Sequence, residues 1–259
     1  MNRRFRQSLL VLLLIAGVVG CADAEEDARD LHIFAASSLR EAFGAMSHRF
    51  SEVESGVRVR LSFGGSQSLR VQIAEGARAD IFASANMHHI EALQSAGHIA
   101  GAQSFARGSL VLVLSRENLA GIHRFSDLPR ATRVVLGTDA SPIGAYTQRC
   151  LQRANQAYGA DFMTRVTERV VSRESNARLV RAKVEMGEAD AAIVYRSDAL
   201  GRAALKVVEL PDSVAIEALY VQGLVLRGES SELAQRWVHF VRSDVGREIM
   251  REHGFEELM

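Results

Sequence analysis

The stretch LHIFAASSL, Leu31–Leu39, contains the transition that decides the fold of this chain. Leu31–Ala36 has the short apolar run of a buried strand, and hydrophobic residues within 39–50 then recur at helical spacing. Two small polar residues, Ser37 and Ser38, stand at the corner between strand and helix. The stretch therefore predicts a strand that passes directly into a helix.

The same transition recurs along the chain. Val57–Phe63 alternates apolar and polar residues, as a half-buried strand does, and a helix follows over 66–75 until Gly76 stops it. Repeated strand-helix units predict an α/β fold with mostly parallel sheets flanked by helices, here in two lobes. Further predicted strands are Asp80–Ala85, Leu110–Leu114, Arg133–Gly137, Val166–Val171, Ala191–Tyr195, Lys206–Leu210 and Ala218–Leu226; further predicted helices are Met87–Ala96, Ser141–Ala154, Asn176–Met186 and two after residue 230.

Composition excludes several classes of protein. The 259 residues are 47% hydrophobic and 24% charged, which excludes a disordered chain. The 31 basic and 31 acidic residues cancel, so the charge excess of a nucleic-acid-binding protein is missing. Cys21 and Cys150 are the two cysteines, and either way of processing a leader at Cys21 or Ala24 leaves Cys150 without a partner, so it is expected to be a small buried residue without a disulfide.

Residues 1–24 have the order of an export signal. Three arginines precede an apolar run, Leu9–Gly20, which is shorter than the ~20 residues of a membrane-spanning helix. Val18–Cys21 fits the pattern at which bacterial lipoproteins are lipidated, whereas Ala22–Ala24 fits ordinary signal cleavage. Both patterns predict a periplasmic protein, and the first would tether it to the membrane through a lipidated Cys21.

The corners between strands and helices share a chemistry. Small hydroxyl or amide side chains stand there beside the free N–H groups of a first helical turn, an arrangement that binds anions. Hydrogen bonds to charged groups contribute about 1.5–3 kcal/mol each, so six or seven neutral donors give on the order of 10–20 kcal/mol before the costs of binding. Four such corners predict an anion cleft between the lobes: Ala35–Leu39, Phe63–Ser68, Ser141–Gly144 and Ser175–Arg178.

Each corner also has a purely structural interpretation. Ser38 with Glu41 matches a capping box, and Ser141 and Asn176 match ordinary helix caps. Arg178, in a first helical turn, is expected to point to solvent or to pair with a carboxylate. Tyr195 ends an apolar strand, so it fits either the core or the cleft.

Signals for catalysis or metal binding are weak. Gly64–Ser68 nearly matches the G-x-S-x-G elbow of serine hydrolases, with Ser66 as nucleophile, but Ser68 replaces the last glycine. The histidines His88, His89 and His98 lack a standard metal-ligand spacing and are expected at the surface, and no nucleotide-binding motif is present in the sequence. An enzyme, a cofactor and direct metal-ion ligands are therefore not expected.

Four segments resemble the periplasmic molybdate-binding proteins of ABC importers, and the resemblance runs from about Leu31 to Phe255. The segments are Phe34–Leu39, Ala79–Ala85, Gly187–Ala199 and His253–Phe255. The resemblance implies a two-lobed periplasmic-binding-protein-like fold with the ligand cleft between the lobes. Lobe I would comprise residues 31–107 and 222–259, and lobe II residues 108–221.

The resemblance also implies a function and a set of ligand residues. Molybdate, and also tungstate, would be held by the hydroxyl groups of Ser38, Ser66 and Tyr195 and by the backbone at Ile143 and Ala177, with Ser37 and Gly65 as neighbouring candidates. The protein would be a monomer that delivers the oxyanion to an ABC permease. Ile143 stands where the family has a smaller residue. Sulfate, thiosulfate or another oxyanion remains the alternative ligand, and a serine hydrolase using Ser66 the alternative class.

Overall fold

The computed structural model describes residues 29–228 and 231–258. The predicted export signal, with its cleavage or lipidation site, lies outside these residues. Within them, no helix is both long and apolar enough to cross a membrane. The strands are β1 (Arg29–Ala36), β2 (Val57–Gly64), β3 (Ile81–Ser84), β4 (Ile99–Ser115), β5 (Val134–Gly137), β6 (Val170–Glu174), β7 (Ala191–Tyr195), β8 (Leu205–Glu209) and β9 (Glu217–Val225).

Helices alternate with these strands, as the sequence predicts. The α-helices are α1 (Arg40–Val53), α2 (Ser66–Ala74), α3 (Met87–Ser95), α4 (Pro142–Tyr158), α5 (Phe162–Thr167), α6 (Ala177–Glu185), α7 (Arg196–Ala199), α8 (Ser231–Val241) and α9 (Asp244–Glu252), and the 3-10 helices are η1 (Ser37–Leu39) and η2 (Phe125–Arg130).

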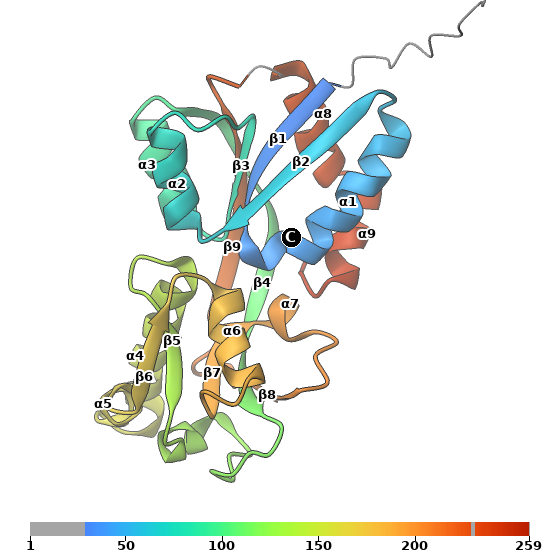
Figure 1. Cartoon of the computed structure of the whole chain (residues 1–259). Coiled ribbons are helices and arrows are strands. Elements are labelled where there is room, and N and C mark those ends of the chain that lie inside the picture. The colour runs from blue at the N-terminus through green and yellow to red at the C-terminus, as the bar shows by residue number, and fades with distance from the viewer. Residues whose placement is uncertain (1–28, 229–230, 259) are drawn as a thin grey trace, which may run out of the picture.

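Two groups of elements are stacked one above the other (Figure 1). We call the group of β1–β3, α1–α3, α8 and α9 lobe I, and the group of β5–β8 and α4–α7 lobe II. The strand order is β2-β1-β3-β9-β4-β7-β5-β6, with β8 paired to β4. The pairs β1–β2, β1–β3, β5–β6 and β5–β7 are parallel, so each lobe has the predicted parallel core.

The long antiparallel strands β4 and β9 join the lobes. β4 pairs with β9 from Ile99 to Ser109, and from Leu110 onwards it pairs with β7 and β8. The predicted lobe boundaries at 107/108 and 221/222 fall inside these two strands. The connection between lobes is therefore two adjacent strands rather than a loop.

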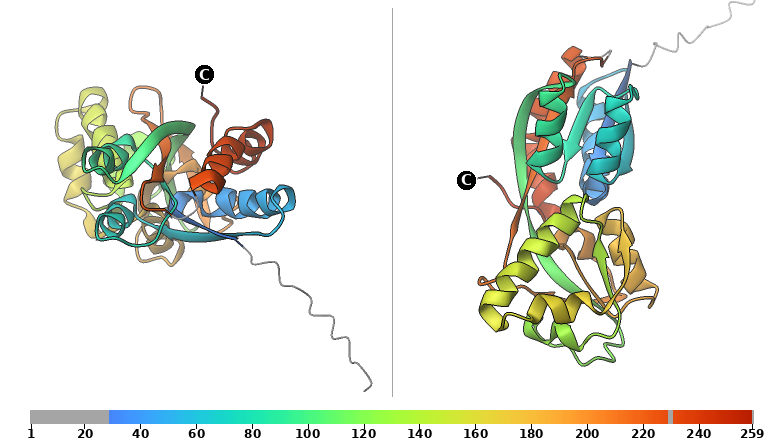
Figure 2. Two further views of the ribbon diagram at one scale, coloured as in Figure 1. Left: turned by 90° about the horizontal axis from the view of Figure 1, so that it is seen from above. Right: turned by 90° about the vertical axis from the view of Figure 1, so that its left-hand side faces the viewer.

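Helices cover both faces of the lobe I sheet. Seen from above, α1 with α8 and α9 lies on one side and α2 with α3 on the other (Figure 2). Trp237 of α8 is fully buried and packs edge-on against Phe43 and Phe50 of α1, with ring centroids 5.5 and 5.2 Å apart. The hydrophobic residues of α1 recur at helical spacing because they form the face that packs against α8. Cys150 is buried, as predicted, and burial raises the pKa of its thiol to about 12.

Two segments differ from the prediction. The predicted strand Val166–Val171 is wrong in its first half, because α5 extends to Thr167 and β6 begins at Val170. Phe162 and Val166 lie four residues apart and are both buried, which is a helical pattern rather than a strand pattern. The first half of β4 was not predicted, since its residues 100–104 are only partly buried or exposed and carry no apolar run.

Candidate functional site

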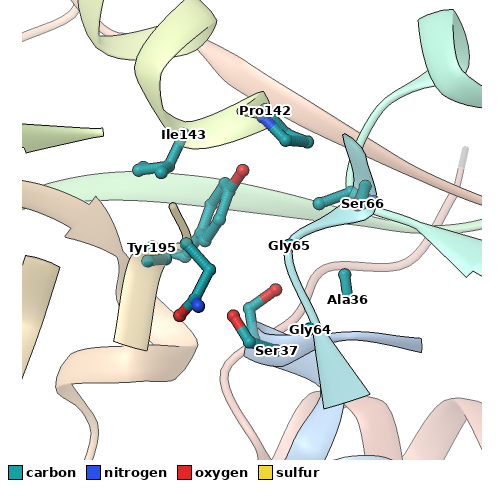
Figure 3. Close-up of a pocket in the computed structure, with 12 residues that line it drawn as sticks. Ala36, Ser37, Gly64, Gly65, Ser66, Pro142, Ile143 and Tyr195 are labelled. Atoms are coloured by element: carbon teal, nitrogen blue, oxygen red, sulfur yellow. Dashed lines mark hydrogen bonds between the residues drawn. The ribbon is translucent and has the colours of Figure 1, made fainter. Parts of the chain in front are cut away.

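A small cavity lies between the two lobes, at the corners where strands pass into helices. The protein leaves about 210 Å³ free of atoms there, part of it open to solvent. In Figure 3, Ile143, Pro142 and Tyr195 approach this space from lobe II, and Ser37, Gly65 and Ser66 from lobe I. The lining residues are Ala36, Ser37, Ser38, Gly64, Gly65, Ser66, Ala85, Pro142, Ile143, Asn176, Ala177 and Tyr195.

All five predicted ligand residues are among these lining residues. Ser38, Ser66, Ile143, Ala177 and Tyr195 come from five different elements, yet each is at most 4% exposed. The neighbouring candidates predicted with them also line the cavity. The fold therefore brings the predicted residues together around one space.

The lobe I corners present helix N-termini without side-chain caps. Ala36 precedes η1 and Gly65 precedes α2, and neither supplies a side-chain hydrogen bond to its helix. The first N–H groups of a helix have no acceptor within that helix. The capping box predicted for Ser38 and Glu41 is wrong, because Ser38 Oγ lies 3.0 Å from the hydroxyl oxygen of Tyr220 and Glu41 pairs with arginines of lobe II.

The lobe II corners have the predicted caps. Ser141 Oγ accepts a hydrogen bond from Gly144 N–H at 3.1 Å, and Asn176 Oδ1 accepts one from Leu179 N–H at 3.2 Å. Each cap therefore satisfies an N–H group deeper in the first turn. Ile143 and Ala177 lie between the cap and its bonded residue, where the helix itself offers their N–H groups no acceptor.

Tyr195 contributes a phenol at the end of β7. Its side chain is 2% exposed, and among the described residues its hydroxyl oxygen has no hydrogen-bond partner. The ring packs edge-on against Tyr146 and Tyr220, with centroids 6.3 and 5.7 Å apart. Burial, aided by the neighbouring acidic groups of Tyr220, Tyr146 and Asp198, raises the pKa of Tyr195 well above its usual value. The phenol therefore keeps its proton and is available as a donor.

No lining residue carries a charge. Arg178 follows Ala177 directly but turns to Glu41, so its predicted pairing with a carboxylate is confirmed. Asp198, three residues after Tyr195, is buried, and neither of its carboxyl oxygens has a hydrogen-bond partner within the described chain. Burial is the main reason that its pKa is raised to about 7. The cavity can therefore attract an anion through neutral donors.

The two lobes approach each other closely beside the cavity. Gln67 Nε2 of α2 donates a hydrogen bond to the carbonyl oxygen of Ser175 at 2.6 Å. A Cβ atom added to Gly65 would come within 2.4 Å of the same carbonyl oxygen. Only a residue without a side chain fits at position 65 in this arrangement of the lobes.

The alternative chemistries gain no geometric support. Ser66 Oγ accepts a hydrogen bond from Ala85 N–H at 3.2 Å, and the cavity lining contains no histidine or carboxylate that could activate it. No group of three or more potential metal-ligating side chains occurs among residues 29–228 and 231–258. The expectation that all three histidines lie at the surface is wrong for His89, which is 3% exposed, and burial lowers its pKa to about 4.

The contacts of two residues next to the site were missed by the sequence reasoning. Tyr220 of β9 is hydrogen-bonded to Ser38 although 182 positions separate them. Glu41 contacts Arg178 and Arg202, which follow it by 137 and 161 positions. No local pattern reports such contacts, since they depend on how the lobes fold together.

Comparison with known proteins agrees with this geometry. Residues 31–256 match the family model of bacterial extracellular solute-binding proteins. The molybdate-binding protein ModA of Mycobacterium tuberculosis is 32% identical over 259 aligned residues, which cover 95% of each chain.

Solved structures show the same fold. The periplasmic molybdate-binding protein of Azotobacter vinelandii has a TM-score of 0.76 at 17% identity, over 88% of this chain and 100% of that one. The sulfate-binding protein SubI of M. tuberculosis has a TM-score of 0.77 at 18% identity, over 89% and 87%. The predicted two-lobed α/β fold of periplasmic binding proteins is therefore confirmed.

Proposed function

This chain belongs to the family of bacterial extracellular solute-binding proteins, and from that membership we propose that it captures molybdate, and also tungstate, for an ABC permease. The supporting observation is the cavity between the lobes. Its lining combines hydroxyl groups and helix N-termini, and it contains no Asp, Glu, Lys or Arg side chain. Such a lining suits an oxyanion that carries no proton of its own.

We assign the ligand contacts to five residues. Ser38, Ser66 and Tyr195 donate from their hydroxyl groups, and Ile143 and Ala177 donate from the backbone. Five donors to a dianion contribute on the order of 7–15 kcal/mol before the costs of association. Submicromolar affinity needs about 8 kcal/mol, so the set is sufficient when the cavity is closed.

Size and protonation set the choice of anion. Fixed donors spaced for the longer metal–oxygen bonds of molybdate lie too far from the oxygens of sulfate. Hydrogen phosphate carries a hydroxyl group that requires an acceptor, which a lining of donors does not supply. Ile143 is fully enclosed and its side chain limits the space on the lobe II side, so it adjusts this size selection.

Closure of the lobes completes the site. We assign residues 31–107 and 222–259 to lobe I and residues 108–221 to lobe II, with β4 and β9 bending as the hinge. Residues 1–24 export the chain to the periplasm, where it acts as a monomer, and a lipidated Cys21 would keep it at the membrane beside its permease. It carries out no reaction and needs no cofactor.

Calorimetric titration of the exported chain tests this function. We expect molybdate and tungstate to bind with submicromolar Kd, and sulfate, thiosulfate and phosphate at least about a thousandfold more weakly. Ligand at 1,000 times Kd should also stabilise the protein by about 4 kcal/mol in thermal unfolding. Tight binding of sulfate or thiosulfate instead would replace the ligand but keep the class, whereas no binding of any oxyanion would overturn the proposal.

A further inference from the structure

Two of the three serine hydroxyls that line the cavity, those of Ser38 and Ser66, already have a hydrogen-bond partner in the protein. Ser66 Oγ is bonded to the backbone N–H of Ala85 at 3.2 Å, and Ser38 Oγ is bonded to the hydroxyl of Tyr220 at 3.0 Å. A hydroxyl group has one hydrogen to donate and two lone pairs to accept. The direction of each of these bonds therefore decides what the serine can offer to a ligand.

The direction at Ser66 is set by covalent structure. The Ala85 N–H can only donate, so Ser66 Oγ accepts there and keeps its hydrogen for the cavity. Ser66 is 1% exposed, which leaves the ligand as the partner for that hydrogen. This serine is a donor whatever anion enters.

The direction at Ser38 depends on Tyr220, because a phenol can donate or accept. Tyr220 is fully buried, and its ring packs edge-on against Phe255 at 5.0 Å between centroids. A Cβ atom added to Gly108 would lie 2.9 Å from the same ring, which leaves it little freedom to move. Burial raises the pKa of Tyr220 well above its usual value, and Asp198 nearby adds to the effect, so the phenol keeps its proton.

A dianion in the cavity selects one of the two directions. If Ser38 donated to Tyr220, only its lone pairs would face the anion, and the contact would be repulsive. If Tyr220 donates to Ser38, the Ser38 hydrogen is directed to the anion. With the dianion bound, the phenol donates to Ser38 as the Ala85 N–H donates to Ser66, but unlike the N–H group it can also accept.

We propose that Tyr220 is a positioning residue that directs the Ser38 hydrogen to a bound dianion, and that it thereby favours fully deprotonated oxyanions over protonated ones. To accept from a protonated anion, Ser38 would have to donate to Tyr220 instead, and the buried phenol hydrogen would then have to turn away from Ser38. This inference rests on the proposed function. Tyr220 does not line the cavity. Without its hydroxyl, the Ser38 hydroxyl can turn and accept a hydrogen bond from a protonated anion such as hydrogen phosphate.

Tyr220→Phe tests this role, because it removes the hydroxyl and keeps the ring. Sulfate and phosphate are the probes, since they are similar in size while only phosphate carries a proton near neutral pH. Each would be titrated against bound molybdate at constant ionic strength. We expect the variant to bind molybdate about threefold to tenfold more weakly, and the phosphate-to-sulfate affinity ratio to rise at least tenfold.

Tyr146→Phe is the matched control. Tyr146 is another buried tyrosine that packs on Tyr195, but its hydroxyl oxygen accepts from Leu219 N–H at 3.2 Å instead of meeting Ser38. Loss of the Tyr146 hydroxyl group should leave the phosphate-to-sulfate affinity ratio unchanged. General damage to the fold would weaken both anions alike, and melting of the ligand-free variants measures that damage separately.

The double variant Ser38→Ala/Tyr220→Phe completes the test. In the absence of the Ser38 hydroxyl, loss of the Tyr220 hydroxyl should have no further effect on the ratio. The inference would be overturned if the phosphate-to-sulfate affinity ratio of Tyr220→Phe stayed within twofold of the wild-type value. It would also be overturned if phosphate failed to displace molybdate from the variant. Failure of the unaltered protein to bind molybdate would instead overturn the proposed function, so the two failures are distinguishable.

Discussion

Arg178 Nη1 lies 2.7 Å from both carboxylate oxygens of Glu41 and so ties the first turn of α6 in lobe II to the first turn of α1 in lobe I. Arg202 Nη2 adds a third contact to Glu41 at 2.9 Å. Burial alone would raise the pKa of Glu41, but the hydrogen bond and charge of Arg178, with Arg202, outweigh burial and lower it. The carboxylate is therefore charged at neutral pH and holds the lobes together next to the cavity.

Glu41→Gln should weaken ligand binding without removing a ligand contact. The three side chains are 22–38% exposed, so their attraction is modest. We expect Kd for molybdate to rise about twofold to tenfold, mainly through faster dissociation measured by stopped-flow fluorescence. Glu52→Gln is the control, because Glu52 pairs with Arg49 on the same helix. Equal effects of both variants would contradict a role between lobes.

Ser38→Ala and Ser66→Ala should each lose one hydrogen bond to the anion. We expect each variant to bind molybdate more weakly by about 1–3 kcal/mol in calorimetry, since the lost bond goes to a charged group. Ser51→Ala is the control, because Ser51 is exposed on α1 and bonds only to a backbone carbonyl there. Unchanged affinity in both cavity variants would refute their assignment as ligand residues.

Gly65→Ala should block closure without disturbing either lobe. The added methyl group would clash with the Ser175 carbonyl of the other lobe and with the amide end of the Gln67 side chain, which is flexible and can turn away. Gly65 itself has φ of −67°, which alanine adopts freely. We expect at least a tenfold loss of affinity and nearly unchanged melting of the ligand-free protein.

Gly44→Ala provides the contrast for that variant. Gly44 lies within α1, and a Cβ atom there meets nothing within 4 Å. The substitution should stabilise the protein by about 0.4–1 kcal/mol and leave affinity unchanged. Normal molybdate affinity in Gly65→Ala would show that closure does not bring Gly65 and Ser175 as close as the structure has them.

Asp198→Asn should change how stability depends on pH. The pKa of Asp198 is raised to about 7, chiefly by burial and against the opposing effect of nearby arginines, whereas an unfolded aspartate titrates near 3.9. Between these values the folded protein holds a proton that the unfolded chain has lost. The free energy of unfolding contributed by this group therefore falls as pH rises through that window, and it is lowest above pH 7.

Urea unfolding at pH 5, 6.5 and 8 measures this effect. Each unit of pKa difference corresponds to about 1.4 kcal/mol, so the variant should gain on the order of 2–4 kcal/mol relative to the unaltered protein between pH 5 and pH 8. His89 opposes this trend in the unaltered protein, because its lowered pKa makes the folded state lose stability as pH falls below about 6.5. Since both proteins contain His89, its contribution cancels in the difference, and a difference that is constant with pH would contradict the assignment.

Local patterns carry a large part of this fold. The short apolar runs at β1 and β7 and the helical spacing in α1 appear in the sequence because each element buries one stripe or one run of side chains. The hydrophobic pattern fails to predict an element where the burial of its residues does not follow the period of that element. Residues 100–104 continue β4 although they are partly buried or exposed, and the end of α5 was predicted as a strand although its two buried residues lie four positions apart.

The sequence by itself determined the chemistry of the cavity, because hydroxyl and amide side chains at strand-to-helix corners are a local property. The corners contain or adjoin the residues that the family resemblance implies as ligands, namely Ser38, Ser66, Ile143, Ala177 and Tyr195, and the folded chain gathers these around one space. Only the tertiary structure decided which residues form hydrogen bonds with the cavity side chains and which ion pairs lie beside the cavity. Tyr220 reaches Ser38, and Glu41 reaches Arg178, through contacts between segments more than 130 positions apart. Such contacts arise from the packing of two lobes, which no local periodicity encodes.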